Sequence, residues 1–69
     1  MNEINLEING EMRALPSVSN VTELLRALGI SEKLVAVELN RKIIRRGEWD
    51  STPVSSGDRI EIVQFVGGG

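Results

Sequence analysis

The residues of this sequence best suited to chemistry are its last ones. Ile60 to Gly69 reads I-E-I-V-Q-F-V-G-G-G, an apolar strand pattern that passes directly into a glycine run. Glycine has no Cβ, so another backbone can approach it closely and any φ is available. At neutral pH the carboxyl group of Gly69 is an anion and a poor electrophile. Adenylyl transfer from ATP would activate it. We therefore expect a flexible C-terminal tail, residues 67–69, that presents this carboxylate to an activating enzyme.

Other reactive side chains are scarce. The 69-residue chain contains no Cys and no His. It therefore lacks a thiolate nucleophile, sulfur ligands for a metal and the usual general base near neutral pH. This composition predicts a protein that is not an enzyme, has no metal site and holds no bound cofactor.

Charge and hydropathy argue against two classes of partner. The net charge is −2, from 8 Lys+Arg and 10 Asp+Glu, and the aromatic residues are one Phe and one Trp. A nucleic-acid-binding surface normally needs a basic excess or stacked aromatic rings. No apolar run approaches the ~20 residues that span a bilayer, and the N-terminus lacks the features of a signal peptide. We expect a cytoplasmic protein with neither nucleic-acid nor membrane partners.

Alternating apolar residues predict the strands that must support the tail. The period-two pattern is clear at residues 3–8 and is followed by Asn9-Gly10, a strong hairpin signal. Further strands are expected over residues 12–15, 35–39, 43–44 and 59–66, the last being the longest, and a tight turn is expected to fold Trp49 onto the core. We place the first and last strands side by side at the centre of the sheet.

One helix is predicted between the second and third strands. Asn20 can cap its first N–H groups, and Glu23 follows three residues later, as in a capping box. Its apolar stripe consists of Val21, Leu24, Leu25 and Leu28. Gly29 is placed to end it. The order β-β-α-β-β-β predicts an α+β domain over residues 1–66, a mixed sheet of about five strands with the helix packed on one face.

The last strand has two faces. Alternation directs Ile60 and Ile62 toward the helix and Glu61, Val63 and Phe65 toward the open side. Apolar anchors beside a polar rim are typical of a docking surface, whereas single exposed apolar side chains also occur without function. Because a partner that acts on Gly69 must hold the adjacent strand, we predict that the open-side residues bind this partner.

Four stretches of the chain together match one known family. They are T-E-L-L at 22–25, V-A-V-E-L-N at 35–40, I-I-R-R-G-E-W at 43–49 and S-G-D-R-I-E-I-V-Q-F-V-G-G-G at 56–69. They resemble the ThiS family of sulfur carriers, which belongs to the ubiquitin-like β-grasp group. The likeness covers residues 5–69 and implies a β-grasp fold.

The resemblance also implies a sulfur carrier for thiamine biosynthesis. An E1-like adenylyltransferase of the ThiF type would adenylate Gly69 with Mg-ATP. A sulfur donor such as a cysteine desulfurase would convert the adenylate to a thiocarboxylate, and a thiazole synthase of the ThiG type would take up the sulfur. Gly68 carries over as the other half of a Gly-Gly ending and Gly67 as an additional glycine. Val63 falls where related carriers contact the activating enzyme.

Three alternatives stay open from the sequence. A MoaD-like sulfur carrier for molybdopterin synthesis would share the tail chemistry, although the I-I-R-R-G-E-W stretch favours ThiS. A ubiquitin-like protein modifier would instead be joined to lysines. A passive binding domain with an inert tail would use basic residues as a phosphate or partner patch, and these would be Arg41, Lys42, Arg45 and Arg46. Charged hairpins are more often simply solvated.

Overall fold

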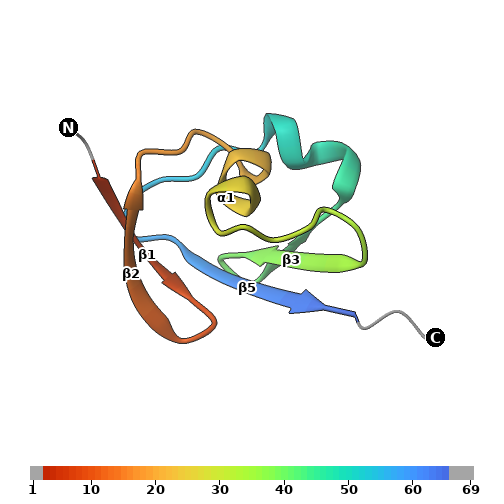
Figure 1. The fold of residues 1–69 in the computed structure, drawn as a ribbon, viewed down its shortest axis with the longest axis horizontal. Coiled ribbons are helices and arrows are strands. Elements are labelled where there is room, and N and C mark those ends of the chain that lie inside the picture. The colour runs from red at the N-terminus through yellow and green to blue at the C-terminus, as the bar shows by residue number, and fades with distance from the viewer. Residues whose placement is uncertain (1–2, 66–69) are drawn as a thin grey trace.

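The computed structural model describes residues 3–65. Its elements are β1 (Glu3–Ile8), β2 (Glu11–Pro16), α1 (Val21–Ala27), β3 (Val35–Leu39), β4 (Lys42–Ile44), the 3₁₀ helix η1 (Arg46–Ser51) and β5 (Arg59–Gln64). The α+β class and the order of strands and helix are confirmed (Figure 1). The expected tail, Gly67 to Gly69, lies outside the described residues.

The strands form one five-stranded sheet in the order β2-β1-β5-β3-β4. The first and last strands lie side by side, as predicted, and pair in parallel at Glu7↔Arg59 and Ile8↔Ile60. The other pairs are antiparallel. β5 is therefore the central strand, and α1 crosses one face of the sheet (Figure 1).

The expectation that the last strand runs to residue 66 and is the longest is wrong. β5 ends at Gln64 and has six residues, as many as β1 and β2. Its length is set by its neighbour, because β3 begins at Val35, which lies opposite Gln64. Phe65 therefore follows β5 and is not part of it.

The core forms between α1 and the inward side of the sheet. Its most completely buried side chains are Leu6, Val21, Leu24, Leu25, Val37 and Ile60. Trp49 is folded onto this core, as predicted, and its Nε1 donates a hydrogen bond to the carbonyl of Ile44 at 3.1 Å. The expected tight turn around Trp49 is instead η1, with the guanidinium of Arg46 4.8 Å from the centre of the Trp49 rings.

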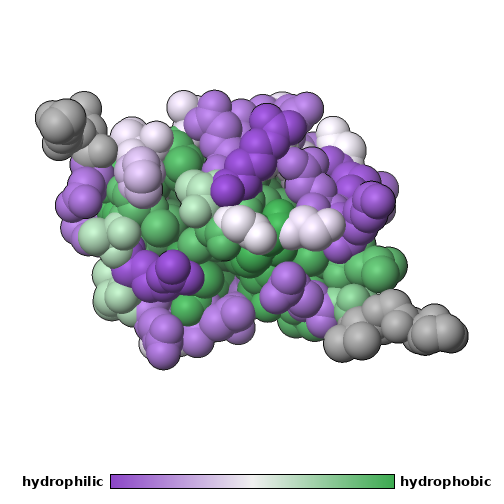
Figure 2. Space-filling model, viewed as in Figure 1, coloured by the Kyte–Doolittle hydropathy of each residue, from purple (hydrophilic) through white to green (hydrophobic). Residues whose placement is uncertain are grey.

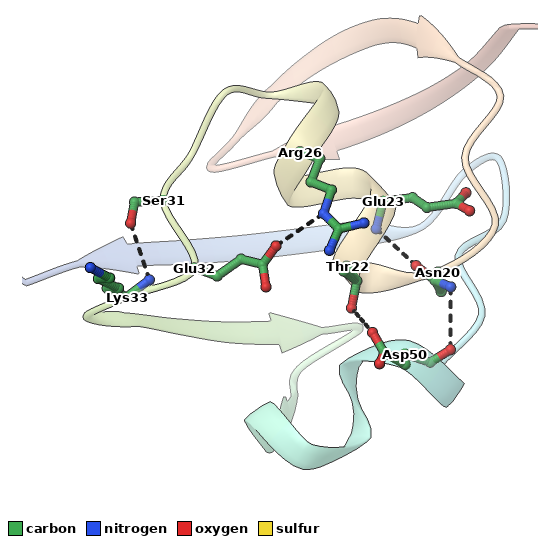
Figure 3. Close-up of polar contacts among 8 residues, drawn as sticks. All are labelled: Asn20, Thr22, Glu23, Arg26, Ser31, Glu32, Lys33 and Asp50. Atoms are coloured by element: carbon green, nitrogen blue, oxygen red, sulfur yellow. Dashed lines mark hydrogen bonds and ion pairs between the residues drawn. The ribbon is translucent and has the colours of Figure 1, made fainter.

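Side chains at the start of α1 join it to η1. The Asn20 side chain accepts a hydrogen bond from the Glu23 N–H at 2.8 Å, and the Glu23 carboxylate accepts one from Ser19 N–H at 2.7 Å. This is a capping box shifted by one residue at its outer bond. Asn20 Nδ2 also donates to the Asp50 carbonyl, and the Thr22 hydroxyl donates to the Asp50 carboxylate (Figure 3). The cap therefore also fixes the position of η1.

The end of α1 follows the predicted glycine signal. Gly29 has φ 72°, and its N–H donates to the Arg26 carbonyl at 3.0 Å. The Ile30 N–H donates to the Leu25 carbonyl at 3.0 Å. These two bonds make a Schellman motif, which needs a residue in the left-handed region and thus favours glycine.

Candidate functional site

The open side of β5 carries the residues that the sequence proposed for docking. Ile60 and Ile62 are buried against α1, while Glu61 is exposed. Val63 is 53% exposed and Phe65 is 56% exposed. The two-faced pattern predicted for this strand is therefore confirmed. Whether the open-side residues bind a partner stays a prediction.

Two residues of the neighbouring strand region enlarge the apolar surface beside Val63 and Phe65. Ala36 lies opposite Val63, and the Phe65 N–H donates to the Leu34 carbonyl at 2.7 Å. Leu34 is 54% exposed. We call the surface of Leu34, Ala36, Val63 and Phe65 the tail-side patch. Figure 2 shows apolar side chains, in green, gathered where β3 begins and β5 ends.

Leu34 was missed in the sequence because it precedes the alternating pattern of β3. Its φ is 53°, and the left-handed region is unfavourable for a bulky side chain. Such outliers occur often at binding sites. The signal available in the sequence was only an apolar residue after the polar S-E-K segment.

Two glutamates on paired strands lie opposite each other next to the tail-side patch. Glu38 on β3 lies directly opposite Glu61 on β5. Like charges in this arrangement destabilise a sheet, and the salt bridges within residues 3–65 involve neither of them. Ile43 follows on β4, opposite Glu38, and is 70% exposed. We call Glu38 and Glu61 the acid pair, which borders the apolar patch and takes part in no ion pair within residues 3–65.

The remaining charged candidates behave differently. Glu7 lies between the buried Leu6 and Ile8 on β1 and so belongs to the open face, but its carboxylate is paired with Arg59 at 3.2 Å. The four basic residues at 41–46 lie in the β3–β4 turn, on β4 and at the start of η1. One of them, Arg46, packs over Trp49. A structural role thus accounts for Arg46, and a phosphate-binding role for this group stays untested.

Two asparagines hold β5 from opposite sides, a role that the sequence did not reveal. Asn9 accepts a hydrogen bond from the Ile62 N–H at 2.7 Å, and its Nδ2 donates to the Ile62 carbonyl at 3.1 Å. Asn40 accepts a hydrogen bond from the Arg59 N–H at 2.9 Å. Each opens a two-residue hairpin turn, with φ of 49° and 51°. Asn is a common turn residue because it tolerates the left-handed region. The sequence therefore indicated only the turns and not the hydrogen bonds of these side chains to β5.

Asn9→Gly should separate the turn from the bonds to β5. Glycine adopts φ 49° without strain, so the turn is kept while Ile62 loses both side-chain partners. We expect the free energy of unfolding to fall by about 1–2 kcal/mol, measured by urea denaturation with Trp49 fluorescence. Asn9→Ala should cost more, because alanine also strains the turn. An unchanged midpoint for Asn9→Gly would show that the carboxamide does not stabilise β5.

No group of three or more Asp or Glu side chains within residues 3–65 is arranged to hold a metal ion. No helix in that range has the length and apolar character needed to cross a membrane. We take the open side of β5, with the tail-side patch and the acid pair, as the candidate site because it combines exposed apolar side chains with two carboxylates in register.

Comparisons with known proteins agree on one family. The family model described as "ThiS family" matches residues 4–69. The sulfur carrier protein ThiS of Bacillus subtilis is 34% identical over 65 residues, which is 93% of this chain and 98% of that protein. A crystal structure of the thiamine biosynthesis protein (ThiS) from Geobacter metallireducens has a TM-score of 0.80 and 40% identity, covering 96% of this chain and 100% of that one.

Longer proteins also contain a segment similar to this chain. A thiazole synthase of Paramagnetospirillum magneticum is 41% identical over 66 residues, which is 96% of this chain. Another, from Magnetococcus marinus, is 33% identical over 66 residues. The chain spans 20% of the length of each.

Proposed function

The chain belongs to the ThiS family, and we propose that it is a sulfur carrier for thiamine biosynthesis that works through the carboxyl group of Gly69. The observation that carries this proposal is the family match, which extends over residues 4–69 and so includes the glycine run. The chain itself catalyses no step and holds no cofactor in this proposal. Because activation consumes ATP, we place it in the cytoplasm.

The proposed chemistry takes place on one carbonyl carbon. The Gly69 carboxylate attacks the α-phosphorus of ATP bound with Mg²⁺ by an E1-like enzyme of the ThiF type, and pyrophosphate leaves. The persulfide of a donor such as a cysteine desulfurase then attacks the acyl carbon and displaces AMP, which gives an acyl disulfide. A thiol of the donor or of the activating enzyme attacks the donor's sulfur atom and breaks the S–S bond, so that a new disulfide forms and the acyl-bound sulfur leaves as a thiolate. The product is a thiocarboxylate, whose sulfur is passed to a thiazole synthase of the ThiG type. Gly67 and Gly68 let the tail lie close to the backbone of the enzyme.

We propose that the activating enzyme docks on the open side of β5. Val63 and Phe65 supply exposed apolar anchors, and Leu34 extends them. Glu61, with Glu38 opposite it, offers a negative site for a cationic side chain of the partner. Ordering a glycine tail costs about 1–2 kcal/mol per residue. This separate surface would supply the binding energy that offsets the cost.

The thiazole synthase relatives support the choice of sulfur acceptor. Two proteins named thiazole synthase contain a segment that is similar to nearly all of this chain. Joining a carrier to its acceptor raises their effective concentration, so such an arrangement fits a carrier that delivers sulfur to that enzyme. This favours the thiazole pathway over a MoaD-like role or conjugation to lysines.

The proposal is tested by the intact mass of the protein purified from its native cells. We expect a fraction of the molecules to be heavier by the difference between a sulfur and an oxygen atom, and a fragment spectrum to place this change at Gly69. Incubation with the ThiF-type enzyme, Mg-ATP and the sulfur donor should increase that fraction. Failure to form either the adenylate or the thiocarboxylate under these conditions would refute the proposal, and lysine adducts would identify a modifier.

A further inference from the structure

The backbone groups of β5 alternate between its two neighbours. Arg59 accepts from Asn40 N–H and Phe65 donates to Leu34, both on the β3 side. Ile60 accepts from Asn9 N–H, and Ile62 exchanges both its bonds with the Asn9 side chain, on the β1 side. This alternation directs the N–H and C=O of Gln64 toward the β1 side as well.

The β1 side of β5 has no strand at the level of Gln64. Backbone pairing between β1 and β5 ends at Ile8↔Ile60, and the Asn9 side chain extends it by one further peptide, at Ile62. Figure 1 shows β5 continuing past the tip of the β1–β2 hairpin with β3 still beside it. None of the hydrogen bonds within residues 3–65 serves Gln64 on that side. Gln64 is also exposed.

Because the backbone N–H and C=O of Gln64 face the β1 side, where no strand of residues 3–65 lies, we propose that this edge of β5 is a strand-addition site. Its occupant would be an extended segment of the activating enzyme. The inference rests on the proposed function and adds a second binding mode to it. An unpaired strand edge is a ready template for another chain, and peptide recognition by strand addition uses such main-chain bonds. The Asn9 side chain already occupies this edge at Ile62. The added segment would pair with the backbone N–H and C=O of Gln64.

Gln64→Pro tests the edge because proline removes the N–H that faces the β1 side. The fold should survive, since proline is tolerated where a strand N–H has no partner. Gln64→Ala is the reference, because it removes the same side chain and keeps the N–H. We expect kcat/KM for ATP-dependent adenylation by the ThiF-type enzyme to be at least about tenfold lower for Gln64→Pro than for Gln64→Ala. Equal values in two folded variants would overturn the inference.

Amide hydrogen exchange of the unmodified protein provides a measurement that does not depend on any variant. The Ile62 amide, bonded to Asn9, should exchange slowly with and without the enzyme. The Gln64 amide should exchange fast in the free protein and at least about tenfold more slowly in the complex. If the wild-type chain is adenylated and Gln64 gains no protection, strand addition is wrong and the carrier function stands. If the wild-type chain is not adenylated at all, both proposals fail.

Discussion

Deletion of Gly69 should abolish thiocarboxylate formation. A chain that is shorter by one residue places its carboxylate about 3.3–3.6 Å away from the position that Gly69 would occupy. A misplacement of about 1 Å can already reduce an enzymatic rate by about 100-fold. We therefore expect the rate of adenylation to fall by more than about 100-fold. This rate is measured as pyrophosphate release in the presence of the ThiF-type enzyme and Mg-ATP.

The same deletion should leave the fold unchanged. Within the part of the chain that the structure describes, the core side chains and the hydrogen bonds that hold β5 come from elements that precede Gly69 by several residues. The free energy of unfolding should therefore stay within about 0.5 kcal/mol of the wild-type value. Gly69→Ala is the companion variant, since it keeps the chain length and adds only a Cβ. Full sulfur transfer by the shortened chain would contradict the assignment of Gly69 as the sulfur-bearing residue.

The elements of this fold were predictable where local signals and burial agree. The alternation of Ile4, Leu6 and Ile8 corresponds to a strand with one buried face. Gly29 corresponds to a helix end that needs a residue in the left-handed region. Asn9-Gly10 has the two positive φ values of a type I′ hairpin turn. In each of these places one short stretch contains the whole physical cause.

The features that the sequence did not predict depend on partners far along the chain. The end of β5 is fixed by where β3 begins. The link from Asn9 to Ile62 spans 53 positions, and the contact of Phe65 with Leu34 needs both strands in register. The sequence did not predict η1 either, because Asp50 in this helix is held by Asn20 and Thr22, which lie 30 and 28 positions earlier. The docking side could therefore be predicted only for β5 itself, and Leu34 was not found.

Val63→Asp should weaken binding of the activating enzyme by about 30-fold or more. Val63 lies 53% exposed beside Ala36 and Phe65, so the change removes an apolar anchor from the tail-side patch. It also adds a third carboxylate close to the acid pair of Glu38 and Glu61. Truncation of a central anchor costs about 2 kcal/mol or more at many interfaces, which corresponds to roughly 30-fold in Kd. Calorimetric titration with the ThiF-type enzyme measures the change.

Met12→Asp is the matched control for this variant. Met12 lies on β2, the edge strand beyond β1, where it is opposite Glu7 of β1. Its side chain is 65% exposed on the open face. It therefore receives the same chemical change at a similar exposure but far from β5. We expect its affinity to stay within about threefold of wild type, as for a residue outside an interface. If both variants bind alike, the tail-side patch is not the docking surface. If Val63→Ala alone reproduces most of the loss, the anchor and not the added charge carries the binding.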